Sequence, residues 1–511
     1  MWRRAWKPAA ATIAIGTPAC LYYYRSTPTF SIPIRVKDVD GKPTMSTKVL
    51  PLLSMEEVNK RLNARANAET IIRHDGIVWN YANAALPSND PIEDAHSKQI
   101  IQRDDASGDY LFFTVMDGHR AGDTSHLLSL VLIKAVSLAL SKLISNSPST
   151  FLTESTVGRV KSMVGFWSAP DADPHRVSVA IQDAFTDLDR ELITAPLRVL
   201  AGNIDGSKVI PDLSKHPLAL KTMLPAISGS CALMAIFDTA HKDLYVACTG
   251  DSRAVAGVWE PTPDGKGHWR VDVLSEDQTG RNPNELKRMQ AEHPKDEADT
   301  VIRNGRVLGG LEPTRAFGDA RYKWTREVHD ALNRSFMVGN DMTLRTQPQT
   351  LKTPPYVTAR PEVTHRKLSF DKSSPGAIRF LVLATDGLWD EITSEEVVSL
   401  VGGHLAGVRG VIPKAELPSL VPTFVKTGSV EGKDHRRKRN RGSWAFCDDN
   451  VGTHLIRNAL GGGDEESLRQ LVSIPAPYSR RHRDDITVTV VWWEEGREED
   501  AQVTTPTKAK L

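Results

Sequence analysis

The stretch Tyr110-Leu111-Phe112-Phe113-Thr114-Val115-Met116-Asp117-Gly118-His119 runs from an apolar segment into a polar turn. Aromatic and β-branched residues dominate its apolar part, a composition typical of a buried strand. Asp117 and Gly118 are turn residues and mark the end of that strand. The sequence therefore predicts a strand over Tyr110–Met116 with an aspartate directly at its end.

The same arrangement, a short apolar run bordered by an acidic motif, recurs along the chain. The other predicted strands are Ala95–Gln102, Ala232–Phe237, Leu244–Cys248, Phe380–Ala384 and Ile486–Trp492. The acidic motifs beside them are Asn89-Asp90-Pro91-Ile92-Glu93-Asp94, Thr249-Gly250-Asp251-Ser252-Arg253, Ala384-Thr385-Asp386-Gly387-Leu388-Trp389-Asp390 and Arg483-Asp484-Asp485-Ile486-Thr487. One aspartate at a strand end is usually only a turn residue, but repeated ones indicate carboxylates that converge. Converging carboxylates repel one another unless cations neutralise them.

The residue types in these motifs indicate the class of cation. They supply oxygen ligands, and no Cys or His cluster has the spacing of a zinc site. Mg²⁺ or Mn²⁺ is therefore expected. Two such ions about 3.5–4 Å apart lower the pKa of a bridging water and hold a phosphoryl group for in-line attack. Gly118 has no side chain, so its carbonyl can approach a metal closely.

His119 follows Asp117 by two positions, so its imidazole is expected beside the metal centre. An isolated histidine is more often structural than catalytic. Next to such a centre, however, an imidazole can protonate a departing alkoxide. The sequence therefore favours His119 as the proton donor in hydrolysis of a phosphate ester.

Several other chemistries lack their sequence signatures. The chain has no GxxxxGK[ST] loop, no HExxH or GxSxG motif, and no cysteine followed six positions later by arginine. Its net charge is +1, so nothing marks it as a nucleic-acid binder. The four cysteines lie far apart and are expected to be reduced and mostly buried.

Helices and insertions complete the expected organisation. Helical patterns cover residues 54–68, with a capping box at Ser54, and also Leu127–Ile144, Val177–Ile193, Leu286–Glu292 and Ser394–Val401. Lys134 and Lys142 argue against a membrane span in the second of these. Insertions are expected near 145–226, 326–356 and 403–446. The last contains the basic run 435–441, which is interpreted as a solvated loop or, alternatively, as a docking patch for an acidic partner.

The N-terminal segment 1–37 is basic and contains no Asp or Glu, as is typical of a mitochondrial targeting sequence. Its apolar stretch 8–24 is at the lower length limit for a membrane anchor, which stays an alternative. A lead-in is expected over 38–77 and a polar tail over 494–511. The tail ends in Ala-Lys-Leu, which is similar to the peroxisomal signal Ser-Lys-Leu and predicts an additional peroxisomal pool.

Taken in order, the motifs from about residue 78 to 493 resemble the type 2C protein phosphatases. The motifs that carry the resemblance are Glu93-Asp94, Asp117-Gly118-His119, Ser228-Gly229-Ser230, Gly250-Asp251-Ser252-Arg253, Arg315-Ala316-Phe317-Gly318-Asp319, Asp386-Gly387-Leu388-Trp389-Asp390 and Arg483-Asp484-Asp485. Within that family, Leu86-Pro87-Ser88-Asn89 and the Tyr322-Lys323-Trp324 segment resemble the pyruvate dehydrogenase phosphatase subgroup.

The resemblance implies an α+β fold, a four-layer sandwich of two antiparallel β-sheets flanked by α-helices. It implies that Asp117, the Gly118 carbonyl, Asp386 and Asp484 hold two metal ions, Mg²⁺ or Mn²⁺. It also implies that Glu93 and Asp94 assist them directly or through water. Asp251 and Asp390 match positions linked to a weaker third ion.

Two residues differ from the usual pattern of the family at positions that concern phosphate binding. Asn89 occupies the place where many relatives have a phosphate-gripping arginine, so it is assigned to substrate binding and the gripping base is left unnamed. Arg120 stands where the family usually has a small residue, and we expect it to narrow the site or contact phosphate.

The expected activity is metal-dependent hydrolysis of phosphoserine and phosphothreonine in proteins. The resemblance implies the E1α subunit of the pyruvate dehydrogenase complex as substrate and the mitochondrion, matrix or intermembrane space, as location. The alternatives are a phosphatase of the intermembrane space or peroxisome with another substrate, and an inactive scaffold.

Overall fold

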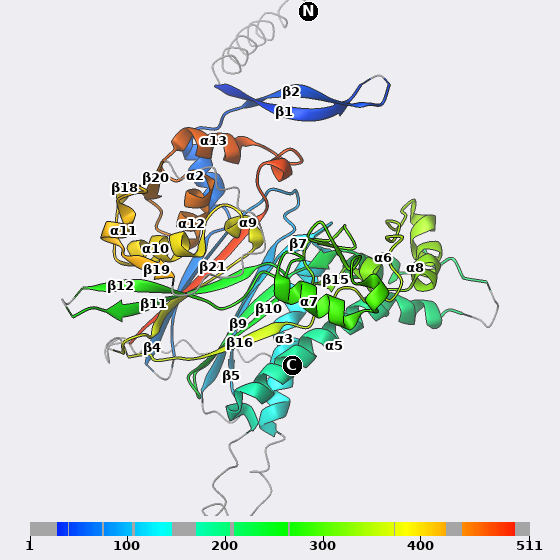
Figure 1. The fold of residues 1–511 in the computed structure, drawn as a ribbon, viewed down its shortest axis with the longest axis horizontal. Helices are drawn as coiled ribbons and strands as arrows, with labels where there is room; N and C mark the ends of the chain where they lie inside the picture. The colour runs from blue at the N-terminus through cyan, green and yellow to red at the C-terminus, as the bar shows by residue number, and fades with distance from the viewer. Residues whose placement is uncertain are drawn as a thin grey trace, which may run out of the picture.

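Two large β-sheets form the centre of the molecule (Figure 1). The computed structural model describes residues 28–38, 40–73, 76–104, 108–145, 170–204, 209–263, 266–371, 374–425 and 442–495. The smaller sheet has five antiparallel strands in the order β16-β10-β9-β6-β5. These are Glu362–Lys367, Asp243–Thr249, Ala232–Asp238, Asp109–Met116 and Ala95–Gln102.

The larger sheet has seven strands in the order β19-β12-β11-β17-β21-β4-β3. They are Thr423–Val425, Gly267–Val273, Arg253–Pro261, Ile378–Ala384, Ile486–Glu495, Ile77–Leu86 and Asn67–Ile72. Neighbours are antiparallel except β12 and β19, which are parallel. The predicted strands are therefore confirmed, each within a few residues of its observed bounds.

Aromatic side chains pack the two sheets face to face. Trp79 of β4 meets Phe237 of β9 with ring centroids 5.0 Å apart, and Phe237 meets Trp493 of β21 at 5.4 Å. All three lie in one buried cluster with aliphatic residues from both sheets. Such edge-to-face pairs add to the stabilisation from burial alone. This apolar layer fixes the distance between the sheets, and with it the edge where the acidic motifs meet.

Helices cover the outer faces of both sheets and complete the expected four layers. α3 (Asp123–Ser145) and α5 (Pro174–Ala201) pack against each other and the five-stranded sheet. The seven-stranded sheet is covered by α2 (Met55–Asn63), α10 (Ser394–Leu405), α12 (Val451–Leu460) and α13 (Glu465–Ser473). α3 is long and apolar enough to cross a membrane by composition, but its buried face belongs to the core of this layer. The predicted fold class is confirmed.

The N-terminal boundaries differ from the prediction. The Ser54 capping box is present, but α2 ends at Asn63 rather than at residue 68. From Asn67 the chain enters β3, which pairs with β4 from Asn67↔Asn83 to Ile72↔Val78. The lead-in therefore supplies an edge strand of the larger sheet and a helix of its core, so the packed elements extend N-terminally beyond residue 78.

Residues before α2 form a separate hairpin. β1 (Thr29–Lys37) pairs with β2 (Pro43–Pro51), so the end of the segment assigned to targeting is a strand. Residues 1–27, including the stretch 8–24, lie outside the described residues. The targeting and anchor assignments stay predictions.

The expected insertions are partly integral to the fold. Within 145–226, α5 and α6 (Ala219–Ile227) contribute to buried clusters. The segment 326–356 begins with α8 (Arg326–Leu332), and its residues Leu332 and Phe336 pack in the same cluster as α6. Within 403–446 lie β18 (Gly410–Pro413), α11 (Leu417–Leu420) and β20 (Ser443–Phe446).

Other sequence predictions concern residues outside the described ranges or single side chains. The basic run 435–441 and residues 496–511 lie outside the described residues. Cys231 and Cys248 are free and buried as expected, whereas Cys447 is free and exposed.

The remaining short elements include a helix and a hairpin in the segment between β12 and β16. α7 (Pro283–Glu292) precedes the hairpin β13 (Ile302–Arg303) and β14 (Arg306–Val307). Three two-residue strands form a small sheet beside the central sheets, with the order β15-β8-β7. They are Phe317–Gly318, Gly229–Ser230 and Gly118–His119.

Candidate active site

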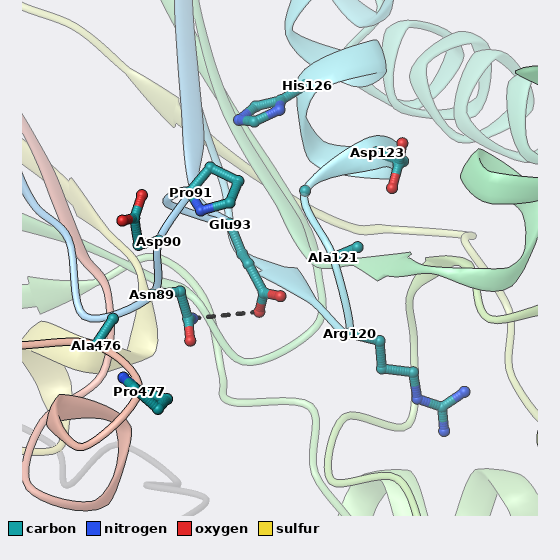
Figure 2. Close-up of a pocket in the computed structure, with 11 residues that line it drawn as sticks. Asn89, Asp90, Pro91, Glu93, Arg120, Ala121, Asp123, His126, Ala476 and Pro477 are labelled. Carbon is teal, nitrogen blue, oxygen red and sulfur yellow. Dashed lines mark hydrogen bonds between the residues drawn. The ribbon is translucent and has the colours of Figure 1, made fainter.

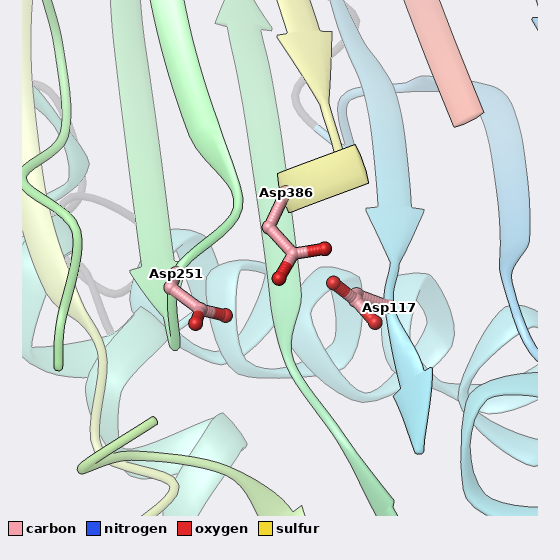
Figure 3. Close-up of side chains that lie close together, drawn as sticks. All are labelled: Asp117, Asp251 and Asp386. Carbon is pink, nitrogen blue, oxygen red and sulfur yellow. The ribbon is translucent and has the colours of Figure 1, made fainter. Parts of the chain in front are cut away.

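Three aspartates from different parts of the chain converge at one end of the sheets (Figure 3). Asp117 lies between β6 and β7, Asp251 follows β10, and Asp386 begins α9 (Asp386–Trp389) directly after β17. One carboxylate oxygen of each lies within 4.8 Å of one from each of the others. The predicted convergence of these strand-end carboxylates is therefore present in the structure.

The electrostatics of this cluster are unfavourable without a cation. Burial and the neighbouring carboxylates of Asp386 and Asp94 raise the pKa of Asp117 well above its usual range. Burial and the carboxylate of Asp386 raise the pKa of Asp484 to about 7, although Arg480 opposes this shift. When several buried carboxylates raise one another's pKa, a bound divalent cation stabilises their ionised forms. The all-oxygen donor set fits Mg²⁺ or Mn²⁺ better than zinc.

The remaining expected ligands surround this cluster. The buried Asp94 accepts a hydrogen bond of 2.9 Å from Thr385 Oγ1, and burial and Asp485 raise its pKa. Asp484 forms an ion pair with Arg480. Asp390 lies one helical turn after Asp386 at the end of α9.

Gly118 packs directly against the backbone of Glu93. A Cβ atom at Gly118 would overlap the Glu93 carbonyl oxygen. The strand that carries Asp117 and the loop that carries Glu93 can therefore approach closely only with glycine at this position. Glycine here has a steric reason in addition to the predicted access of its carbonyl to a metal.

Asp485 organises the loop that carries Asn89 and Glu93. It accepts hydrogen bonds from the backbone N–H groups of Asn89 at 2.9 Å and Glu93 at 2.8 Å, and from Asn89 Nδ2 at 3.0 Å. It also accepts one from the Ser88 N–H. Asn89 Nδ2 donates further to Glu93 Oε2 at 3.3 Å. Asn89 therefore contacts Asp485 and Glu93, so the geometry gives it a role in positioning Glu93.

Replacement of Asp485 with Ala is expected to destabilise the protein, because it leaves buried backbone donors without a partner. Each such donor costs roughly 1–3 kcal/mol. Thermal unfolding should show a clear fall in Tm, and Asp187→Asn on the exposed face of α5 provides a neutral comparison. Equal Tm values for Asp485→Ala and the wild type would show that this carboxylate does not hold the loop.

His119 is held by Asp319, which belongs to one of the sequence motifs but had no predicted role. Its Nε2 lies 2.5 Å from Asp319 Oδ2, and the Asp319 side chain is fully buried. Burial alone would lower the pKa of His119, but the Asp319 carboxylate outweighs that effect and raises it. Gly229 leaves room for the pair, because a Cβ there would overlap both His119 Nε2 and Asp319 Oδ2. The Ser-Gly-Ser motif thus has a physical explanation.

The arginines of the sequence motifs are structural. Arg253 is buried, pairs with Asp277 through two hydrogen bonds and lies over the ring of Trp389. Arg315 pairs with Glu285 of α7. Arg483 donates to the Pro87 carbonyl oxygen at 2.6 Å. Each connects one motif to another part of the fold, so the motif arginines do not supply the missing phosphate-binding base.

A pocket of about 520 Å³ opens beside the acidic cluster (Figure 2). Figure 2 shows the Glu93 side chain between Asn89 and the turn that carries Arg120. Asp123 and His126 at the start of α3 line another side, with Ala476 and Pro477 opposite. The pocket gives a substrate group access to the Glu93 carboxylate at the edge of the cluster.

Comparisons with known proteins agree with this geometry. The family model for protein phosphatase 2C matches residues 208–409. A protein phosphatase 2C homolog of Schizosaccharomyces pombe is 36% identical over 458 residues, which cover 88% of each chain. The mitochondrial [pyruvate dehydrogenase [acetyl-transferring]]-phosphatase 1 of Saccharomyces cerevisiae is 35% identical and covers 86% of this chain and 73% of its own length. The human protein of that name is 31% identical, with 88% and 85% coverage.

A solved serine-threonine phosphatase 2C from Toxoplasma gondii superimposes with a TM-score of 0.40 and 16% identity, covering 92% of this chain and all of its own. The family assignment rests on the sequence relatives, which match most of the chain, and on the acidic site. The chain belongs to the protein phosphatase 2C family of metal-dependent protein serine/threonine phosphatases.

Proposed function

We propose that this phosphatase removes phosphate from the E1α subunit of the pyruvate dehydrogenase complex in mitochondria. The observation that carries the proposal is the similarity, over most of the chain, to the yeast and human mitochondrial pyruvate dehydrogenase phosphatases. Asn89, which stands in place of a phosphate-gripping arginine, lies in a loop held by Asp485, and this is consistent with that subgroup.

The proposed metal site uses Mg²⁺ or Mn²⁺, with two ions in the main site and a weaker third. Its ligands are the carboxylates of Asp117, Asp386 and Asp484 and the carbonyl of Gly118, assisted by Glu93 and Asp94, with Asp251 and Asp390 at the third ion. The close approach of the Asp117, Asp251 and Asp386 carboxylates supports this assignment. When bound, the ions acidify the attacking water and neutralise the phosphoryl oxygens.

His119 is proposed to protonate the serine or threonine oxygen as it leaves. Asp319 accepts from Nε2, which orients the ring and favours its protonated state. Because a serine alkoxide is a poor leaving group, a positioned acid lowers the barrier for its departure. Asp319 acts here through His119 and is a positioning residue.

Arg480 is proposed as the phosphate-binding base that replaces the family arginine missing at Asn89. Its guanidinium pairs with Asp484, and it also lies near enough to Asp386 and Asp117 for them to raise its pKa against the opposing effect of burial. The side chain is 46% exposed, so a phosphate group that arrives from solvent can contact it. A guanidinium in that position can bind two phosphate oxygens at once.

Replacement of Arg480 with Ala should raise KM for a phosphoserine peptide about 10- to 100-fold, because a charge-assisted hydrogen bond to phosphate is lost. Steady-state kinetics with Arg480→Lys should show partial recovery. The adjacent exposed Arg481→Ala is the matched control and should retain the wild-type KM. An unchanged KM in Arg480→Ala would mean that the metals alone hold the phosphate.

The substrate proposal is tested by phosphate release from phosphorylated E1α compared with a panel of other mitochondrial phosphoproteins. The proposed function requires a kcat/KM for E1α that is clearly the highest of the panel. Equal turnover of all substrates would leave a protein phosphatase with another physiological target, in the intermembrane space or the peroxisome.

The proposed location is the mitochondrion, as for the relatives named above. Imaging of a protein tagged upstream of its free C-terminus, with protease protection of isolated mitochondria, distinguishes the matrix from the intermembrane space. Deletion of Leu511 tests the peroxisomal pool, which should disappear if Ala-Lys-Leu is read as a signal. Signal confined to the cytosol would contradict both locations.

A further inference from the structure

A second pocket of about 370 Å³ adjoins the first and shares Arg120, Ala121 and Asp123 with it. Its apolar wall comes from Leu224 and Ile227 of α6 and, further along the chain, from Trp324, Met342 and Leu344. Because the two pockets share one turn of the chain, a substrate segment held in the first can extend directly into the second.

Three arginines line this second pocket: Arg120, Arg321 and Arg345. The Arg120 and Arg321 guanidinium carbons lie 5.8 and 5.5 Å from the ring centroid of the same buried tyrosine, Tyr322. Arg120 is held there by a left-handed backbone, with φ of 70°. Burial and the charges of Arg120 and Arg345 lower the pKa of Arg321, so each of these two cations lies close enough to Arg321 to repel it.

Nearby acids do not balance this positive charge. Asp319 lies 3.6 Å from Arg120 but is buried and already paired with His119. Asp123 is the one carboxylate among the residues that line the pocket. In the part of the chain that the structure describes, the exposed Arg345 guanidinium forms no hydrogen bond or ion pair. An excess of positive charge in a partly apolar pocket attracts an anionic group.

The position of the pocket indicates where that anion lies on a substrate. Arg120 follows Asp117 by three residues, so their Cα atoms are at most about 11 Å apart. An extended polypeptide advances about 3.3–3.6 Å per residue. A side chain roughly two to five residues from the scissile phosphoserine can therefore reach the arginines.

We propose that this pocket is a specificity subsite that binds a second anionic side chain of the phosphoprotein substrate, close in sequence to the phosphoserine being hydrolysed. The inference rests on the proposed protein phosphatase activity, but not on pyruvate dehydrogenase being the substrate. Carboxylate and phosphate share the chemistry that the arginines recognise, and substrates that carry one or the other separate these two sources.

The test uses synthetic peptides with one phosphoserine and a single Ala, Glu or second phosphoserine placed two to five residues away on either side. KM and kcat are measured for wild type, Arg345→Ala and Arg345→Glu. Arg334, exposed on the same segment but outside the pocket, provides the matched variants Arg334→Ala and Arg334→Glu. Arg345 and Arg334 lie outside the proposed catalytic machinery, so p-nitrophenyl phosphate hydrolysis should be unchanged in all four.

Wild type should show a lower KM for at least one acidic peptide than for its Ala counterpart. Arg345→Ala should raise that KM about 2- to 5-fold, the usual range for a solvent-exposed ion pair, and Arg345→Glu should raise it further. The kcat should change little, because the interaction exists equally before and during reaction. A larger gain with the second phosphoserine than with Glu would identify a phosphate as the preferred anion.

The proposal is overturned if wild type does not distinguish acidic from Ala peptides, or if Arg334→Glu raises KM as much as Arg345→Glu. Failure of the underlying phosphatase activity looks different, because wild type would then hydrolyse neither p-nitrophenyl phosphate nor any peptide. Since the p-nitrophenyl phosphate assay also reports whether each variant is folded, a misfolded variant is recognised independently of the peptide results.

Discussion

Replacement of Asp386 with Asn is expected to lower kcat/KM for a phosphoserine peptide by at least about 10³-fold. Asp386 meets Asp117 and Asp251 at the centre of the acidic cluster, so the change removes charge from the proposed metal site. Stabilisation of the phosphoryl group by metal ions is worth several kcal/mol, and each 1.36 kcal/mol is a factor of ten in rate. Asp117→Asn and Asp484→Asn should show comparable losses.

A second readout separates loss of metal from loss of fold. Without divalent cations the Asp386→Asn protein should be at least as stable as wild type, because one repelling carboxylate is gone. Adding Mn²⁺ should raise the Tm of wild type but not that of the variant, since only a protein that binds the ion is stabilised by it. Asp187→Asn on α5 should behave as wild type in both assays. Turnover near the wild-type level in Asp386→Asn would contradict the assignment of Asp386 as a metal ligand.

Replacement of His119 with Ala should lower kcat for a phosphoserine peptide about 10²- to 10⁴-fold, the range expected for loss of a general acid. Hydrolysis of p-nitrophenyl phosphate should fall much less, because nitrophenolate leaves without protonation. Asp319→Asn should give a weaker form of the same split between substrates, since the ring then loses its orienting carboxylate. Equal losses on both substrates would assign His119 a structural role.

Sequence reasoning identified the strands and acids well because each leaves a local signal. β6 and β17 are mostly apolar, and an aspartate follows each of them within two positions as a visible turn residue. Because the same pattern of a strand followed by an acidic turn recurs, the sequence also predicted that these carboxylates converge. The order of several such motifs then gave the family.

The supporting residues could not be predicted because their partners are distant in sequence. Asp319 is 200 positions from His119, and Asp485 is 392 positions from Glu93. Arg480 has the same local appearance as any arginine in a polar loop, and only the fold places it against the acidic cluster. A signal for Asp319 did exist, since Ser228-Gly229-Ser230 and Phe317-Gly318-Asp319 both have a glycine where a side chain would block the approach.

The error at the N-terminus has a similar origin. Helical propensity continues past Asn63, but β4 offers a free strand edge that residues 67–72 satisfy through a full antiparallel register. Tertiary pairing therefore overrode the local preference, as it commonly does for short segments.

The central claim is that this acidic cluster makes the chain a metal-dependent protein phosphatase. The most direct measurement is phosphate release from a phosphoserine protein, recorded with Mg²⁺ or Mn²⁺, after EDTA, and after the ions are restored. The account predicts activity that requires the ions, disappears in EDTA and returns on their addition. Phosphate release that continues unchanged in excess EDTA would contradict it.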